Sequence, residues 1–167
     1  MKGGKIFSAA LILVMILTML ISCENNREHK VGNLSFTVPE TLRATGEEGY
    51  DLYLSTMECA VTVQELNDEI LGEAGLSKSD GLEVLVDEYF NKNKIDKDQC
   101  YLTYSEEQSA YKFRYSMSFD DNVYYFHYVI MIGNEDNVYF VDMFCEFEDA
   151  NYYLQEFERW GKSFKLK

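Results

Sequence analysis

The chain has 167 residues, with 29 acidic and 15 basic side chains and a formal charge of −14. This length accommodates one domain, and a hydrophobic content of 47% with 15% aromatic residues is too high for a disordered chain. Binding to a nucleic-acid backbone requires clustered Lys and Arg, so the acidic excess argues against that class of partner.

The N-terminal segment has the pattern of a secretory signal. Residues 1–5 carry two lysines and no acid, and residues 6–21 are uncharged and almost wholly apolar. A membrane-spanning anchor is the alternative, because an apolar run of this length approaches the lower limit for crossing a bilayer. The sequence Leu20-Ile21-Ser22-Cys23 resembles the lipobox of bacterial lipoproteins and favours the cleaved signal. The resemblance implies that signal peptidase II cuts before Cys23 and that the sulfur of Cys23 carries diacylglycerol.

These features predict three regions. Residues 1–22 form a lipoprotein signal peptide, residues 23–30 are the lipidated cysteine and a polar tether, and residues 31–167 form a single globular domain. Stable membrane attachment needs two acyl chains, which the lipid on Cys23 supplies. The expected location is therefore the extracytoplasmic face of a bacterial cell membrane, with the protein held there by its lipid.

The mature chain begins with short strands and a helix. Alternating apolar residues predict a strand over 34–38 that stops at Pro39, and two more strands are expected over 50–54 and 59–63. Residues 64–78 predict a loop with at most one turn of helix. Asp80 followed by Glu83 resembles a capping box and predicts a helix of about twelve residues after it.

The second half of the chain predicts an antiparallel meander and a closing helix. Strands are expected over 100–104, 111–119, 123–132 and 138–147, and the short polar turns between the last three require antiparallel neighbours. Apolar residues at helical spacing from Ala150 to Phe164 predict a second helix, with Asp149 as its cap.

The two faces of the meander depend on the strand register. We expect Phe119 to pair with Val123 and Ile132 to pair with Val138, which places His127 and Cys145 together on an apolar face. The opposite face then carries a row formed by Arg114, Tyr128 and Asp142. The middle strand is apolar on both sides, so one helix is expected on each face. A change of one residue in either turn would exchange these faces.

The order of elements resembles a known fold. The domain opens with Phe36-Thr-Val-Pro39 and closes with Phe157-Glu-Arg-Trp-Gly-Lys-Ser-Phe164. Together with the element order, these segments are similar to the PsbP-like α/β/α sandwich, which includes the extrinsic photosystem II subunit, a Ran-binding nuclear import factor and bacterial lipoproteins of the DcrB-like kind. The resemblance implies an α+β fold, an antiparallel sheet with helices on both faces, and a binding or assembly module without catalytic residues or a cofactor.

Two groups of residues are candidate binding sites. The row of Arg114, Tyr128 and Asp142 is either a partly buried ion pair bridged by a phenol or the floor of a small-molecule pocket. An acidic group is expected at one end of the sheet, where carboxylates could bind Ca²⁺ or serve only as turn and helix-cap residues; its members are Asp120, Asp121, Glu146, Glu148 and Asp149.

The cysteines give little support to catalysis. His127 beside Cys145 would have the composition of a nucleophile pair, but apolar neighbours raise the pKa of a thiol and make it inert. Besides Cys23, the chain has Cys59, Cys100 and Cys145. A disulfide between Cys59 and Cys100 is one possibility, and three buried thiols is the other.

The sequence therefore predicts a membrane-anchored, noncatalytic module that binds a protein or another envelope component. The alternative is an extracytoplasmic carrier of a small ligand or of Ca²⁺. No enzyme activity, no cofactor other than the lipid, and no nucleic-acid partner are expected.

Overall fold

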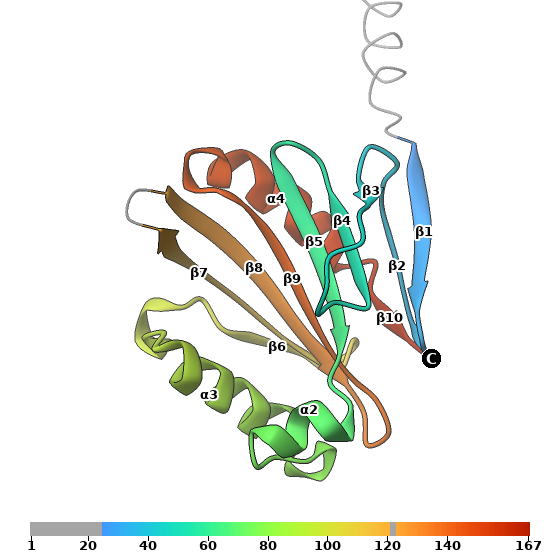
Figure 1. Cartoon of the computed structure of the whole chain (residues 1–167), viewed down its shortest axis with the longest axis vertical. Helices are drawn as coiled ribbons and strands as arrows, with labels where there is room; N and C mark the ends of the chain where they lie inside the picture. The colour runs from blue at the N-terminus through green and yellow to red at the C-terminus, as the bar shows by residue number, and fades with distance from the viewer. Residues whose placement is uncertain (1–24, 121–122) are drawn as a thin grey trace, which may run out of the picture.

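The computed structural model describes residues 25–120 and 123–167. It is an α+β fold in which an antiparallel sheet of seven strands is covered on both faces, with a second sheet of three strands beside it (Figure 1). Cys23 and Asp121 lie outside the described residues, as does the predicted signal. Within the described ranges, no helix is long and apolar enough to cross a membrane.

The strand order of the large sheet is β3-β4-β5-β9-β8-β7-β6. Its strands, in chain order, are β3 (Arg43–Ala44), β4 (Leu52–Ser55), β5 (Cys59–Glu65), β6 (Thr103–Ser105), β7 (Ala110–Asp120), β8 (Val123–Gly133) and β9 (Val138–Glu146). The predicted meander is thus β7-β8-β9, and β5 pairs antiparallel with β9 to extend it. The segment predicted as a loop contains a short helix, α2 (Asp68–Glu73), capped by the side chain of Asn67.

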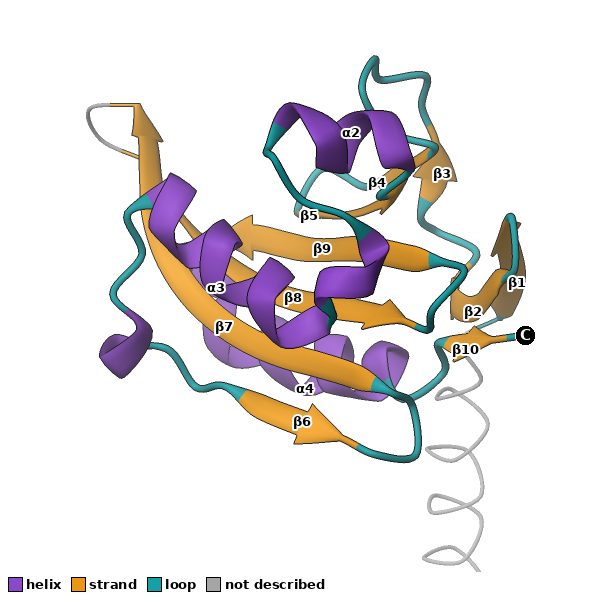
Figure 2. Ribbon diagram, turned by 90° about the horizontal axis from the view of Figure 1, so that it is seen from below, coloured by secondary structure: helices purple, strands orange, loops and turns teal. Residues whose placement is uncertain are grey.

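The two predicted helices lie on opposite faces of the sheet (Figure 2). Helix α3 (Leu82–Asn93) has the expected length, but its N-cap is Gly81, and the capping box is formed by Ser77 and Asp80 in the 3₁₀ turn before it. Helix α4 (Ala150–Gly161) begins at the expected residue, although the side chain of Asp149 makes no capping hydrogen bond. The expected capping of both helices was therefore wrong in detail, while the helices themselves are confirmed.

The register of the first hairpin is as predicted along most of its length, whereas that of the second is shifted by one residue. Arg114 pairs with Tyr128 in the expected register, but an irregularity between Ser118 and Asp120 pairs Val123 with Asp120 in place of Phe119. In the second hairpin Val138 pairs with Gly133, not with Ile132. The turn between them is held by Asn134, whose amide donates to the carbonyl of Asn137 at 2.8 Å and whose side chain accepts two backbone amides.

The absence of a side chain at Gly133 permits its pairing with Val138. A Cβ at Gly133 would lie 2.7 Å from the carbonyl oxygen of Asn137. The shift exchanges the two faces of β9, because successive side chains point to opposite sides of a strand.

Two apolar clusters separated by the sheet form the core. The cluster under α4 contains Phe157 and Trp160 from the helix, Ile130 from β8 and Val141 from β9. The cluster under α3 contains Val86 and Phe90 from the helix and Phe113 from β7. β8 is buried on both faces, which agrees with its apolar sequence and with cover on both sides.

The small sheet joins the two ends of the described chain. Its order is β1 (Asn26–Val31), β2 (Leu34–Pro39) and β10 (Lys165–Leu166). Residues 26–30 were expected to belong to a tether, but they form β1 and pair with β2 along its whole length. The ring of His29 stacks on Phe36 at a centroid distance of 5.6 Å. The part of the folded domain that the structure describes therefore includes residues 26–30.

Candidate functional site

The predicted row of Arg114, Tyr128 and Asp142 does not form. Arg114 and Tyr128 are cross-strand partners on the α4 side of the sheet. Asp142 pairs with Val129 and lies on the α3 side, because of the register shift in the second hairpin. The same shift separates His127 from Cys145, since Cys145 pairs with Phe126 and shares its face.

Asp142 instead forms a buried hydrogen-bonded pair with His127. The Nδ1 atom of His127 lies 2.9 and 3.1 Å from the two carboxylate oxygens of Asp142, and the side chains are only 3% and 14% exposed. The ring of Tyr115 stacks on His127 at 4.8 Å, and the hydroxyl of Tyr115 lies 2.6 Å from that of Tyr89. Burial, and secondarily the charge of Asp142, raises the pKa of both phenols well above the usual range, so both stay protonated. The polar atoms of this group are therefore used in contacts within the fold.

Arg114 is occupied by two partners on the other face. Its guanidinium lies over the ring of Tyr101 at 4.4 Å, and its Nη1 atom lies 3.7 Å from a carboxylate oxygen of Glu158. Burial, followed by the charge of Glu158, raises the pKa of Tyr128 to about 12. The cavity at these residues has a volume of about 110 Å³. Ligand pockets usually measure about 300–1,000 Å³, so this cavity does not favour the small-ligand carrier.

The acidic group at the end of the sheet is only partly described. Asp121 lies outside the described residues, and so does the side chain of Asp120. Glu146 ends β9, and Glu148 and Asp149 belong to the 3₁₀ turn before α4. Within residues 25–120 and 123–167, no three acidic, His or Cys side chains gather closely enough to hold a metal ion.

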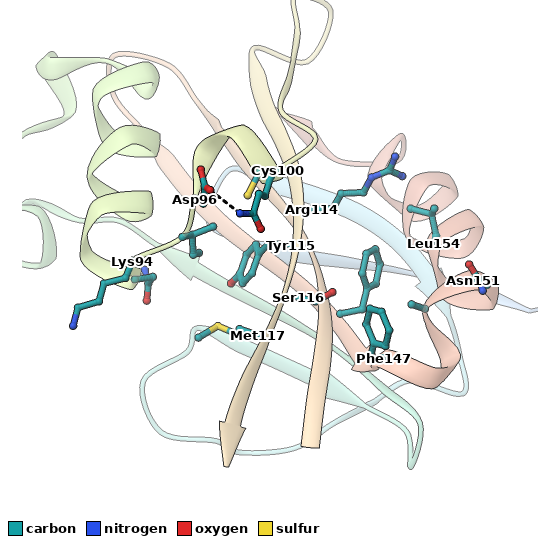
Figure 3. A pocket seen from close by; sticks show the side chains of 15 residues that line it. Lys94, Asp96, Cys100, Arg114, Tyr115, Ser116, Met117, Phe147, Asn151 and Leu154 are labelled. Atoms are coloured by element: carbon teal, nitrogen blue, oxygen red, sulfur yellow. Dashed lines mark hydrogen bonds between the residues drawn. The ribbon is translucent and has the colours of Figure 1, made fainter. Parts of the chain in front are cut away.

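A groove that sequence reasoning missed runs along β7 and has a volume of about 680 Å³ (Figure 3). One wall is formed by the end of α3 and the segment after it, including Ile95, Asp96 and Cys100. The other wall is formed by Phe147 and by Ala150, Asn151 and Leu154 of α4. Arg114, Tyr115, Ser116 and Met117 of β7 form the floor, together with Phe126 of β8. Phe147 is 54% exposed, which is high for a side chain of its size and gives the groove an apolar wall.

β7 also has an open edge in this groove. β6 pairs only with Ala110, Tyr111 and Lys112, and the described part of β7 beyond Lys112 has no strand on that side. The amide of Gly133 donates to the carbonyl of Ser109, directly opposite in the β7–β8 register, so odd-numbered residues of β7 bond to β8. The backbone N–H and C=O groups of Arg114 and Ser116 therefore point outward.

The three cysteines of the described chain are thiols. Cys59 and Cys145 are buried on the α4 side, whereas Cys100 is half-buried and packs in the cluster under α3. A bridge between Cys59 and Cys100 would have to pass through the sheet, so that pairing is wrong. Cys100 is also less buried than expected.

Comparison with known proteins supports the fold. No family model matches the chain, and no curated protein matches it. The solution structure of cyanobacterial PsbP (CyanoP) from Synechocystis sp. PCC 6803 is similar, with a TM-score of 0.57 and 12% sequence identity over 88% of this chain and 95% of that chain. At this identity the likeness concerns the fold alone, and it confirms the PsbP-like α+β architecture.

Proposed function

We propose that this protein is a noncatalytic assembly module that binds an extended segment of a protein partner along the open edge of β7, and that a lipid on Cys23 holds it at a membrane. The PsbP-like fold supports an assembly role, because the family implied by the resemblance consists of binding modules. The single observation that carries the proposal is the coincidence of the groove with the unpaired backbone groups of Arg114 and Ser116.

An added strand would satisfy the edge of the sheet and fill both sides of the groove. An exposed edge is a template for pairing with an extended peptide, in which main-chain hydrogen bonds give affinity and pockets for alternate side chains give specificity. Side chains of the peptide opposite Arg114 and Ser116 would contact Phe147 and Leu154. Those opposite Tyr115 and Met117 would contact Ile95 and Cys100.

The residues that line the groove determine which side chains the bound peptide would carry. The α4 wall is largely apolar, whereas the α3 wall mixes Ile95 and Cys100 with polar side chains, so the segment carries apolar residues at alternate positions on the face toward α4 and polar residues on the other. The cation of Arg114 is already matched by Glu158, and Asp96 accepts a hydrogen bond from the side chain of Gln99 at 2.7 Å. A charged side chain on the face of the segment toward α4 would therefore lose hydration without gaining a partner.

Hydrogen exchange on the complex tests this mode of binding. The protein is first purified from its membrane with a photo-crosslinking residue at Asn151, in the groove, and the crosslinked partner segment is identified by mass spectrometry. A crosslinker at Arg43 in β3, on the opposite edge of the sheet, is the matched control. The synthetic segment is then added, and exchange is measured residue by residue.

The expected result is slower exchange at the amides of Arg114 and Ser116, with little change at Tyr115, whose amide already bonds to β8. Ser116→Pro removes one outward N–H and should weaken binding at least tenfold, whereas Ser116→Thr should retain it. Uniform protection of the whole strand, or equal crosslinking from Arg43, would contradict the proposal. A crosslink to a second copy of this chain would reassign the groove to self-association.

The lipid anchor is tested separately. Cys23→Ser should leave an unlipidated precursor that is not cut by signal peptidase II, because only a thiol can form the thioether. The measurement is the mobility and mass of the protein recovered from membranes. Normal processing and membrane attachment of Cys23→Ser would overturn the anchor without affecting the groove.

A further inference from the structure

Cys59 and Cys145 lie directly opposite each other on neighbouring strands. They are register partners in the antiparallel pair formed by β5 and β9. Both side chains belong to the cluster under α4, and their exposed fractions are 7% and 1%. Cys100 is on the other side of the sheet, so these two thiols have no competing cysteine among the described residues.

The hydrogen-bond pattern places this pair in a non-hydrogen-bonded position. The amide of Leu66 donates to the carbonyl of Val138 at 2.8 Å, and these two residues continue the β5–β9 register. Hydrogen-bonded and non-hydrogen-bonded pairs alternate along an antiparallel ladder. Leu66 is seven positions after Cys59, an odd difference, so Cys59 and Cys145 face each other in the non-hydrogen-bonded class.

This class brings side chains close enough for a covalent bond. The Cα atoms of a non-hydrogen-bonded pair are about 4.5 Å apart, at the short end of the range of about 4.4–6.8 Å that disulfides span. Closure therefore requires rotation of the two side chains and no shift of the register. The pair is also at the end of both strands, since Cys59 is the first residue of β5 and Cys145 is followed by only one residue of β9. Local opening at this end exposes the thiols without disrupting the centre of the sheet.

We propose that Cys59 and Cys145 form a cross-strand disulfide when the protein meets a disulfide-bearing oxidant, such as the oxidised form of a dithiol oxidoreductase. In this step the two S–H bonds break and one S–S bond forms. The two electrons and two protons pass to the disulfide of the oxidant, which becomes two thiols. Cys100 remains a thiol. The predicted export of the chain would place it among such oxidants, although the geometry of the pair is independent of the groove on β7.

The bond would close a long loop between β5 and β9 and restrict the unfolded chain. Such constraints raise stability most when the loop is long. We expect the melting temperature of the oxidised protein to exceed that of the reduced protein by roughly 10 °C.

Mass spectrometry of the full-length protein decides the proposal. The protein is extracted from membranes in detergent with N-ethylmaleimide to trap thiols, and a second sample is equilibrated with oxidised glutathione. Non-reducing digestion should yield one linked peptide pair containing Cys59 and Cys145, lighter than the two separate peptides by two hydrogens. Cys100 should carry the alkylating group in both samples.

Variants separate the bond from general effects of mutation. Cys100→Ser should retain the linked pair and the reductant-dependent change in melting temperature. Cys59→Ser and Cys145→Ser should each lose both, and the remaining thiol should be alkylated after unfolding. Complete alkylation of Cys59 and Cys145 after treatment with oxidised glutathione, or a linkage of either to Cys100, would overturn the proposal.

Discussion

The hydrogen-bonded pair of His127 and Asp142 provides a sharp test of the register of β9. Asp142→Ala leaves the Nδ1 atom of a histidine that is 2% exposed without its carboxylate partner. Leaving a buried group without its hydrogen-bond partner costs about 1–3 kcal/mol. Because the His127 side chain is only 3% exposed, the upper part of that range applies. We expect a loss of about 2 kcal/mol in the free energy of unfolding, or roughly 7 °C in melting temperature.

Urea unfolding followed by fluorescence measures this loss directly. Trp160 is the single tryptophan of the chain and is 5% exposed in the core under α4, so its emission reports on unfolding. Asp136→Ala, in the exposed turn before β9, is the matched control and should change stability by less than about 0.5 kcal/mol. The double variant His127→Phe with Asp142→Leu should recover most of the loss, because it removes both hydrogen-bonding groups and keeps an aromatic ring beside Tyr115. A loss for Asp142→Ala no larger than that of the control would refute the pair and the register that creates it.

Three further predictions concern other parts of the molecule. Gly32→Ala should destabilise the protein by about 1–2 kcal/mol, because Gly32 has φ +52° and a Cβ there would lie 2.5 Å from the hydroxyl of Tyr139. Gly49→Ala is the control for backbone strain alone, because Gly49 has φ +94° and open space around it. An equal decrease of the melting temperature in the two variants would contradict the clash. Burial raises the pKa of Cys145 to about 12, so in the reduced protein the buried thiol stabilises the fold fully below its ordinary pKa of 9.0, and this stabilisation should be lost as the pH rises from 9.0 to about 12. The urea midpoint of Cys145→Val should fall less steeply over that range. An unchanged slope would contradict this pH dependence. Burial, followed by the charge of Arg27, lowers the pKa of His29 below its ordinary 6.5, so stability should fall as the pH drops through that value. His29→Phe should reduce the loss of stability between pH 7 and 5. Identical pH profiles of the variant and the unmodified protein would contradict this role of His29.

Local sequence patterns determine the β7-β8 hairpin but leave β9 ambiguous. The polar turn sequence of residues 120–122 and the alternation in β7 define one register, and the structure has it as far as Ser118. In β9, Val138 and Phe140 lie on one face and Tyr139 and Val141 on the other, so either register buries apolar side chains. The choice depends on the turn at Asn134 and on the close approach at Gly133, which are tertiary details. The one sequence signal was the chemical match between His127 and Asp142, which the shifted register brings together.

The strand β1 and the groove were missed for related reasons. The segment Arg27–Lys30 is charged and lacks apolar alternation, and it becomes a strand only because β2 offers it an edge. The groove depends on β6 covering only three residues of β7. Neither fact is local to the residues concerned, so periodicity within one segment does not reveal it. The helices, in contrast, were predictable because each carries its own apolar stripe.

Because β1 starts at Asn26, the domain would lie very close to a lipid carried by Cys23. With a lipid on Cys23, only three peptide steps separate the anchored residue from Asn26, and these span at most about 11 Å. A compact domain of this size is about 40 Å across, so this linker would be much shorter than the domain attached to it. Under the proposed anchor, the domain would tilt about its N-terminal end but would not leave the bilayer surface. A partner that binds as proposed would then have to present its extended segment within one domain diameter of the lipid surface.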